Sequence, residues 1–378
     1  MGTEKYGYWG YLNKKFLNKF EALANATSTT KHEVKFRYHD QVWSKFDRTL
    51  LGKYSLNELY KQRAQQLRDK YDYLILYYSG GADSHNILRT FIDNNILLDE
   101  VCVKWPKLLM DGGLYTPNQH DTSAKNYWSE WNYSVKPTLE WLSQNHPSIK
   151  ITIKDYTDSI DKLKIEPMFE KLNFVRGGGI LLNSVISTSE NIVLDKGKTV
   201  SHIYGIDKPL LHTDEKHIFM FFSDVCLDQA CRSELVEDST ECFYWAPDFP
   251  LLPFEQAYQL SLYYKANPHT QKFLWNDLPT PLDVRTMKNQ FQNSVARQLL
   301  YDNWDGRFQA DKPSSSSRKD KFFWFYEHSE LENVRMNYYD SLKQRVELID
   351  TKYLAVPTDG SIPVYNVCVS NKFYITTI

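Results

Sequence analysis

Apolar runs that predict strands alternate along the central part of the chain with stretches of helical spacing. Residues 74–78 are all apolar or aromatic, which is typical of a strand buried on both faces, and apolar residues at helical spacing over 84–94 predict the helix that follows. The next apolar run, at 100–105, predicts a second strand. Because a strand, a crossover helix and a second strand form a βαβ unit, we expect an α/β fold with a parallel sheet.

Further elements are predicted on both sides of this unit. Residues 55–71 read as a helix, because Ser55 and Glu58 match the capping-box pattern at its start. Alternating polar and apolar residues at 150–156 indicate a strand nearer the sheet edge. The other predicted elements are helices at 127–145, 180–191, 253–266 and 283–304, a strand at 199–204, and a hairpin of strands at 217–222 and 241–245 joined by an acidic loop.

The two ends of the chain differ from this central part. An apolar pattern from Tyr8 to Leu23 predicts a short helix, and alternation at 33–38 predicts a strand. Toward the other end, the sequence predicts a serine-rich flexible linker at 311–318, an aromatic-rich helix at 321–349 and strands at 353–356 and 362–378. We therefore expect an N-terminal arm, an α/β domain and a mainly helical C-terminal region with terminal β-strands, at 1–54, 55–270 and 271–378.

Composition narrows the class of protein. The 45 Lys and Arg nearly balance the 47 Asp and Glu, which argues against binding nucleic acid mainly through net charge. The 26 Tyr, 20 Phe and 10 Trp are interpreted first as core residues, with base stacking less favoured. There is no apolar stretch of 18 or more residues and no h-region among the first residues, so we expect neither a membrane span nor a signal peptide. The cysteines are scattered and odd in number, which fits a reducing compartment. We expect a soluble, cytoplasmic protein with no membrane partner.

The candidate chemistry lies between the first strand and its helix, in the sequence Ser79-Gly-Gly-Ala-Asp-Ser84. Gly80 and Gly81 allow a sharp turn and the close approach of a ligand, and the free N–H groups at the start of the helix favour an anion. Ser79 and Ser84 add hydroxyl donors, and Asp83 could cap the helix or hold Mg²⁺. No lysine follows the glycines, so this is not a Walker loop, and it is not the G-x-G-x-x-G fingerprint of dinucleotide sites either.

This loop resembles the S-G-G-x-D-S signature of the PP-loop ATP pyrophosphatase superfamily. Its members include the synthetase domain of asparagine synthetase, the deazaguanine synthase of queuosine biosynthesis and PAPS reductase. The resemblance implies a parallel sheet sandwiched by helices, of the adenine nucleotide α-hydrolase-like (HUP) type. It also implies cleavage of ATP between the α- and β-phosphates, with Mg²⁺ near Asp83. The residues implied to bind ATP are Ser79, Gly80, Gly81, Ala82, Asp83 and Ser84.

Three other segments carry candidate site residues. Gly205 and Asp207 lie in a loop after a predicted strand, where PP-loop relatives often carry a second ATP-contacting loop, and Lys208 is the predicted cation on the phosphates. Lys104, at the end of the second strand, is a further basic candidate for the nucleotide. Arg176 precedes three glycines, which indicate either a second anion-binding turn or a flexible hinge. The predicted catalytic set is Asp83, Lys208 and Arg176.

The spacing of the cysteines and histidines indicates neither a zinc site nor a catalytic cysteine. His212 and His217 lie near three cysteines, but the cysteine spacings do not match paired zinc ligands, so buried thiols are the default and zinc is left open for Cys226, Cys231 and Cys242. No cysteine precedes Cys102. We therefore expect no N-terminal catalytic cysteine of the kind that asparagine-synthetase-type glutaminases expose.

The leading hypothesis is an ATP-dependent ligase that requires Mg²⁺ and adenylates a carboxyl or carbonyl oxygen of a small-molecule substrate. Ammonia or another amine would then attack the activated carbon, as in asparagine synthetase but without the glutaminase domain. One alternative is a PP-loop enzyme that modifies a nucleobase or a nucleic acid held by the aromatic-rich C-terminal region. Another is a non-catalytic nucleotide-binding regulator or scaffold. The acceptor, the nitrogen or sulfur donor and the oligomeric state are not defined by the sequence.

Overall fold

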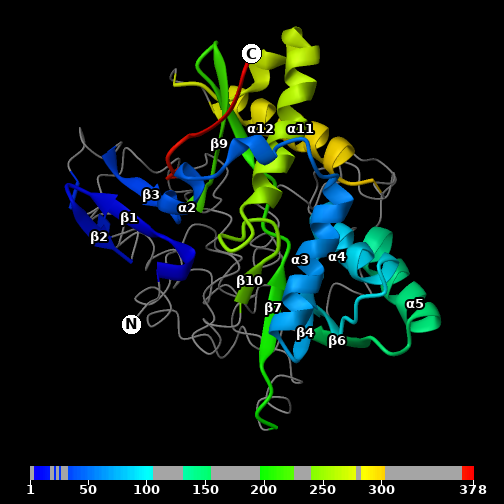
Figure 1. The fold of residues 1–378 in the computed structure, drawn as a ribbon. Coiled ribbons are helices and arrows are strands. Elements are labelled where there is room, and N and C mark those ends of the chain that lie inside the picture. The colour runs from blue at the N-terminus through cyan, green and yellow to red at the C-terminus, as the bar shows by residue number, and fades with distance from the viewer. Residues whose placement is uncertain are drawn as a thin grey trace, which may run out of the picture.

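The centre of the protein is a five-stranded parallel sheet with helices packed on it (Figure 1). The computed structural model describes residues 4–17, 21–22, 25–26, 33–104, 131–154, 196–224, 240–277, 282–302 and 368–378. The strands lie in the order β10-β7-β4-β5-β6. Their bounds are β4 (Tyr73–Tyr77), β5 (Glu100–Lys104), β6 (Lys150–Lys154), β7 (Val200–Tyr204) and β10 (Thr240–Cys242).

The strand order is that of a doubly wound sheet. β4 comes first in the chain and lies in the middle, β5 and β6 follow on one side, and β7 and β10 lie on the other. In such sheets the direction of winding switches between two neighbouring strands, here β4 and β7, and ligands bind beyond the carboxyl ends of the strands at that point. The predicted α/β fold with a parallel sheet is confirmed, and the alternating strand β6 lies at the sheet edge as expected.

The helices of this sheet follow the predicted pattern. α3 (Leu56–Lys70) and α4 (Ala82–Asp93) pack against each other and against β4. The predicted capping box starts α3: the Ser55 hydroxyl accepts a hydrogen bond from the backbone N–H of Glu58, and the Glu58 carboxylate accepts one from the N–H of Ser55 at 2.8 Å. Between β5 and β6, a π-helical turn, η6 (Trp131–Val135), leads into α5 (Lys136–Asn145).

A second sheet corrects the predicted hairpin of 217–222 and 241–245. β9 (His217–Phe221) pairs with β8 (Leu210–Thr213) and with β11 (Phe373–Thr377), all antiparallel. β10 instead joins the parallel sheet beside β7. The prediction was wrong because a short apolar run shows that a strand is buried but does not show which strand it pairs with. The turn from β8 to β9 is closed by Asp214, which accepts a hydrogen bond from the N–H of His217 at 2.7 Å.

A third sheet lies near the N-terminus, where a helix from Tyr8 to Leu23 was predicted. Its strands are β1 (Tyr8–Tyr11), β2 (Lys14–Phe16) and β3 (Lys35–Arg37), in the order β2-β1-β3. In β1 the buried side chains alternate, which is the period of a strand, and Trp9 and Tyr11 are the buried members. Leu12 and Asn13 both adopt positive φ angles, as a two-residue hairpin turn requires.

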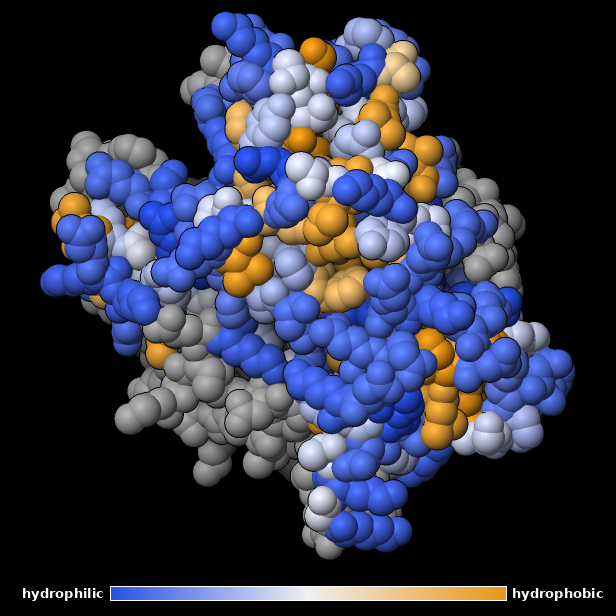
Figure 2. All heavy atoms as spheres, viewed as in Figure 1, coloured by the Kyte–Doolittle hydropathy of each residue, from blue (hydrophilic) through white to orange (hydrophobic). Residues whose placement is uncertain are grey.

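Helix α11 (Leu251–Ala266) connects the parts of the molecule. It packs against α3, against β11 of the second sheet and against α12 (Leu282–Leu300), with a 3₁₀ helix, η8 (Pro268–Phe273), between the two long helices. Shorter elements complete the described chain: η1 (Glu4–Tyr6), α2 (Asp40–Ser44) and η3 (Arg48–Leu50). The face of the molecule seen in Figure 1 is largely hydrophilic, with hydrophobic residues in its upper middle and in a second group toward the lower right (Figure 2).

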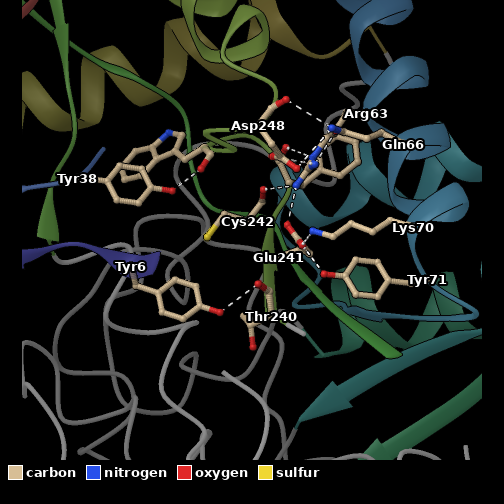
Figure 3. A network of polar contacts seen from close by, with 12 residues as sticks. Tyr6, Tyr38, Arg63, Gln66, Lys70, Tyr71, Thr240, Glu241, Cys242 and Asp248 are labelled. Atoms are coloured by element: carbon tan, nitrogen blue, oxygen red, sulfur yellow. Dashed lines mark hydrogen bonds and ion pairs between the residues drawn. The ribbon is translucent and has the colours of Figure 1, made fainter. Parts of the chain in front are cut away.

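A buried polar network joins α3 to β10 (Figure 3). Arg63 has no exposed side-chain surface, and its Nη2 lies 3.0 Å from Oε2 of Glu241. The other carboxylate oxygen of Glu241 accepts hydrogen bonds from Lys70 at 2.8 Å and from the Tyr71 hydroxyl at 2.5 Å. Arg63 also donates to the backbone carbonyls of Cys242 and Phe243. The last strand of the parallel sheet is therefore held by charge-assisted bonds as well as by its ladder.

Several predictions concern residues outside those that the structure describes. They are the helices at 180–191 and 321–349, the linker at 311–318 and the strand at 353–356. The division of the chain into three regions stays a prediction. In the described part of the chain, no helix combines the length and the hydrophobicity needed to span a membrane.

Candidate functional site

The loop Ser79–Ser84 lies where β4 ends and α4 begins, as predicted. Gly80 has a φ angle of 78°, in the left-handed region that favours glycine, and Gly81 is the N-cap of α4. The Ser84 hydroxyl accepts from the Ser79 N–H at 3.2 Å and donates to the Gly81 carbonyl at 3.1 Å. The two predicted phosphate-binding serines therefore bond within the loop and hold its shape. The N–H groups in the first turn of a helix lack partners within the helix and favour an anion, so the start of α4 is the candidate phosphate site.

A second loop, from Gly205 to Lys208, packs directly on the first. It follows β7, which pairs with β4, so both loops leave the sheet at the same edge. A Cβ atom at Gly205 would lie 3.1 Å from the Ser84 nitrogen and 3.3 Å from Cβ of Asp83. Both distances are shorter than ordinary van der Waals contacts, so glycine at 205 allows the two loops to meet. The two loops therefore lie side by side, at the same edge of the sheet, as the sequence analysis predicted.

The two loops place opposite charges together. Nζ of Lys208 contacts Oδ1 of Asp83 and lies 3.2 Å from Oδ1 of Asp207. The Lys208 side chain is 4% exposed, whereas that of Asp83 is 21% exposed. Burial alone would lower the pKa of Lys208, but the carboxylates of Asp83 and Asp207 outweigh burial and hold that pKa above its ordinary value. Lys208 is therefore a buried cation at the carboxyl edge of the sheet.

Two tyrosines that the sequence analysis did not identify complete this cluster. The hydroxyl of Tyr301, directly after α12, donates to Oδ1 of Asp83, and the hydroxyl of Tyr244 donates to the backbone carbonyl of Asp83 at 2.9 Å. Burial raises the pKa of both hydroxyls well above the ordinary value, so both stay protonated donors. Arg297, one helical turn before Tyr301, lies close enough for its charge to lower the pKa of Lys208. No local motif marks these residues.

Lys104 lies in a different environment from Lys208. Its Nζ is 4.4 Å from the ring centroid of Tyr77, and the Tyr77 ring stacks on that of Tyr204 at 4.6 Å. Tyr77 belongs to a smaller hydrophobic cluster that is separate from the main core. Lys104 therefore ends its strand as predicted, but its described contact is with an aromatic ring and not with Asp83 or Lys208. Arg176 lies outside the described residues.

Cysteine chemistry, and a metal site built wholly from protein ligands, receive no support from the described residues. Among them, no group of three His, Cys, Asp or Glu side chains is arranged to hold a metal ion. Cys226 and Cys231 lie outside the described residues, and Cys242 is buried. Burial raises the pKa of the Cys102 thiol to about 12, so this strand residue is not a thiolate nucleophile at neutral pH.

The donor set does fit a Mg²⁺ ion that arrives with a nucleotide. Such ions use one or two protein carboxylates, with phosphate oxygens and water completing six ligands. In the described part of the chain, both side-chain contacts of Asp83 fall on Oδ1, and Oδ2 has no protein partner. No protein-family model, curated protein or solved structure matches the chain, so its assignment depends on this geometry.

Proposed function

We propose that the protein is an ATP-dependent adenylating enzyme of the PP-loop type, with the adenine nucleotide α-hydrolase-like (HUP) form of the α/β fold. The observation that carries the proposal is the contact between Asp83 and Lys208. These residues come from two loops 125 positions apart, each identified from its own sequence, and they meet at the carboxyl ends of β4 and β7. A doubly wound sheet binds its ligand at this switch point.

The charges at this point suit a triphosphate. The N–H groups of the first turn of α4 and the positive end of its dipole favour phosphate oxygens. Lys208 supplies a buried cation, and Arg297 places a second positive charge nearby. Asp83 and Asp207 add two carboxylates, and among the described residues Oδ2 of Asp83 has no protein partner. Bound Mg²⁺ would supply the charge that stabilises the departing pyrophosphate.

In the proposed reaction, a carboxyl or carbonyl oxygen of the substrate forms a bond to the α-phosphorus of ATP. The bond between that phosphorus and the α,β-bridging oxygen breaks, and pyrophosphate leaves with the electron pair. An ammonia or amine nitrogen then attacks the activated carbon, and AMP leaves. Lys208 and the backbone dipoles of the loop offset the negative charge that builds on the leaving group.

The test is a product assay with Mg-ATP and a panel of carboxylates, amino acids and nucleosides. Substrate-dependent AMP and pyrophosphate would support the proposal, whereas ADP would contradict the PP-loop assignment. Asp83→Asn should abolish product formation. Asp93→Asn is the matched control, because Asp93 lies on the same helix in a partly exposed ion pair with Arg89. A protein that gains thermal stability with Mg-ATP but forms no product with any substrate would be a nucleotide-binding regulator, and the enzyme proposal would be wrong.

A further inference from the structure

We infer that Tyr301 is a positioning residue for the Mg²⁺ site, and this inference rests on the proposed function. Tyr301 follows α12, in a part of the chain to which the sequence assigned no role in nucleotide binding. Its hydroxyl donates to Oδ1 of Asp83 across 218 positions of sequence. Its side chain is 3% exposed, so the hydroxyl contacts protein and not bulk water.

The contact selects one oxygen of the Asp83 carboxylate. Lys208 and Tyr301 both bond to Oδ1, and within the described chain Oδ2 has no partner. Tyr244 fixes the backbone carbonyl of the same residue and in turn accepts a hydrogen bond from the Asn86 amide at 3.0 Å. The backbone carbonyl and Oδ1 of Asp83 therefore both have protein partners, and Oδ2 is the atom left to bind a cation.

Tyr301 is itself fixed before any ligand binds. The carbonyl of Leu300, the last residue of α12, accepts a hydrogen bond from the buried Tyr60 hydroxyl at 2.8 Å. The Gln256 amide of α11 donates to the same hydroxyl at 3.1 Å, and Asn57 of α3 bonds to Asp302. α3 thus holds the chain on both sides of Tyr301, at Leu300 and at Asp302, and α11 supports the first of these contacts through Gln256.

The two partners of the Asp83 carboxylate differ in charge, and this difference decides how each affects a metal ion. Lys208 neutralises the charge of Asp83, so its bond to Oδ1 competes with a metal ion for that carboxylate. A tyrosine hydroxyl orients the carboxylate and leaves its charge intact. Partners that orient a metal ligand in this way typically contribute about 10–100-fold to metal affinity. Tyr301 therefore keeps Asp83 in place for Mg²⁺ when Lys208 bonds to the phosphates.

The experiment measures how much Mg²⁺ the protein needs to bind ATP. The full-length wild type and Tyr301→Phe are titrated with MgCl₂ at fixed ATP and with ATP in EDTA, by calorimetry and by thermal shift. Tyr71→Phe is the matched control, because it also removes a buried hydroxyl that donates to a carboxylate, at the other end of β4 from Asp83. Phenylalanine keeps each ring, so packing is preserved in both variants.

We expect Tyr301→Phe to raise the Mg²⁺ concentration for half-maximal ATP binding by about tenfold, and Tyr71→Phe to leave it unchanged. ATP binding in EDTA should be the same in all three proteins. If the Mg²⁺ requirement of Tyr301→Phe equals that of the wild type, or if both variants shift it equally, Tyr301 is structural only and the inference is wrong. If the wild type itself does not bind Mg-ATP, the proposed function fails and the inference fails with it.

Discussion

Replacing Glu241 with glutamine tests whether the buried network in Figure 3 stabilises the fold. The Glu241 side chain is 7% exposed, and it is the buried counter-ion of Arg63, which has no exposed surface. Asp248, the other acidic partner of Arg63, is 43% exposed. Glutamine would keep the shape of the side chain and remove its charge, so Arg63 would stay buried with only a partly exposed counter-ion.

Two arguments give similar values for the folding free energy that Glu241→Gln would lose. Burial alone would raise the pKa of Glu241, but the charge of Arg63 and the hydrogen bonds from Lys70 and Tyr71 lower that pKa to about 2, from an ordinary value of 4.5. At ~1.36 kcal/mol for each pH unit, this difference corresponds to about 3 kcal/mol of folding free energy. Removing one partner of a buried ion pair typically costs about 3–5 kcal/mol. We therefore expect Glu241→Gln to lower the free energy of unfolding by about 3 kcal/mol at pH 7.

The contribution of Glu241 to the free energy of unfolding decreases as the pH falls. Because the pKa of Glu241 is lower in the folded state, its contribution is fully present above the unfolded pKa of about 4.5 and is lost as the pH falls toward 2. At pH 3 about 2 kcal/mol of the contribution is lost in the wild type, and the variant has nothing corresponding to lose. The stability difference between wild type and Glu241→Gln should therefore narrow by about 2 kcal/mol between pH 7 and pH 3.

The assay is equilibrium urea unfolding, followed by tryptophan fluorescence and far-ultraviolet circular dichroism at both pH values. Asp248→Asn is the control, because it removes the same charge from the same arginine at an exposed position, and it should cost less than about 1 kcal/mol. Equal costs for the two variants would refute the reasoning, since burial would then make no difference. The reasoning would also be refuted if the stability difference between wild type and Glu241→Gln were the same at both pH values.

Three further predictions concern the site and its scaffold. Lys208→Met should weaken Mg-ATP binding at least about tenfold in calorimetry, because a buried cation on the phosphates is lost, and unchanged affinity would contradict that role. Gly205→Ala should also weaken ATP binding, since its Cβ would crowd the first turn of α4, whereas Gly10→Ala, whose Cβ meets nothing closer than 3.6 Å, should not. Ser55→Ala should lower the free energy of unfolding by about 1 kcal/mol through loss of the α3 cap, and Ser143→Ala, on the exposed face of α5, should cost clearly less; similar losses would argue against the cap.

The sequence by itself determined the local features of this protein. The capping residues of α3, the apolar run of β4 and the serine–glycine loop before α4 all lie within a few positions of the structure that they specify. Their signals depend on hydrogen bonds and φ angles within one turn, so no distant partner is needed to interpret them. The alternation in β6 likewise predicted its place at the sheet edge, although Ile153, one of its apolar members, is itself exposed.

Only the tertiary structure decided which of these parts meet. Hydrophobic periodicity reports how deeply a segment is buried but not against which segment, and for this reason β10 was assigned to the wrong partner. Over the four residues of β1 the apolar pattern does not separate a strand from a helix, so this segment was assigned to a helix. The contact of Tyr301 with Asp83 depends on the packing of α12 on α11 and of α11 on α3. The loop of the site is thus local in origin, and the side chains that hold its carboxylate come together because distant helices bury their apolar faces on one another.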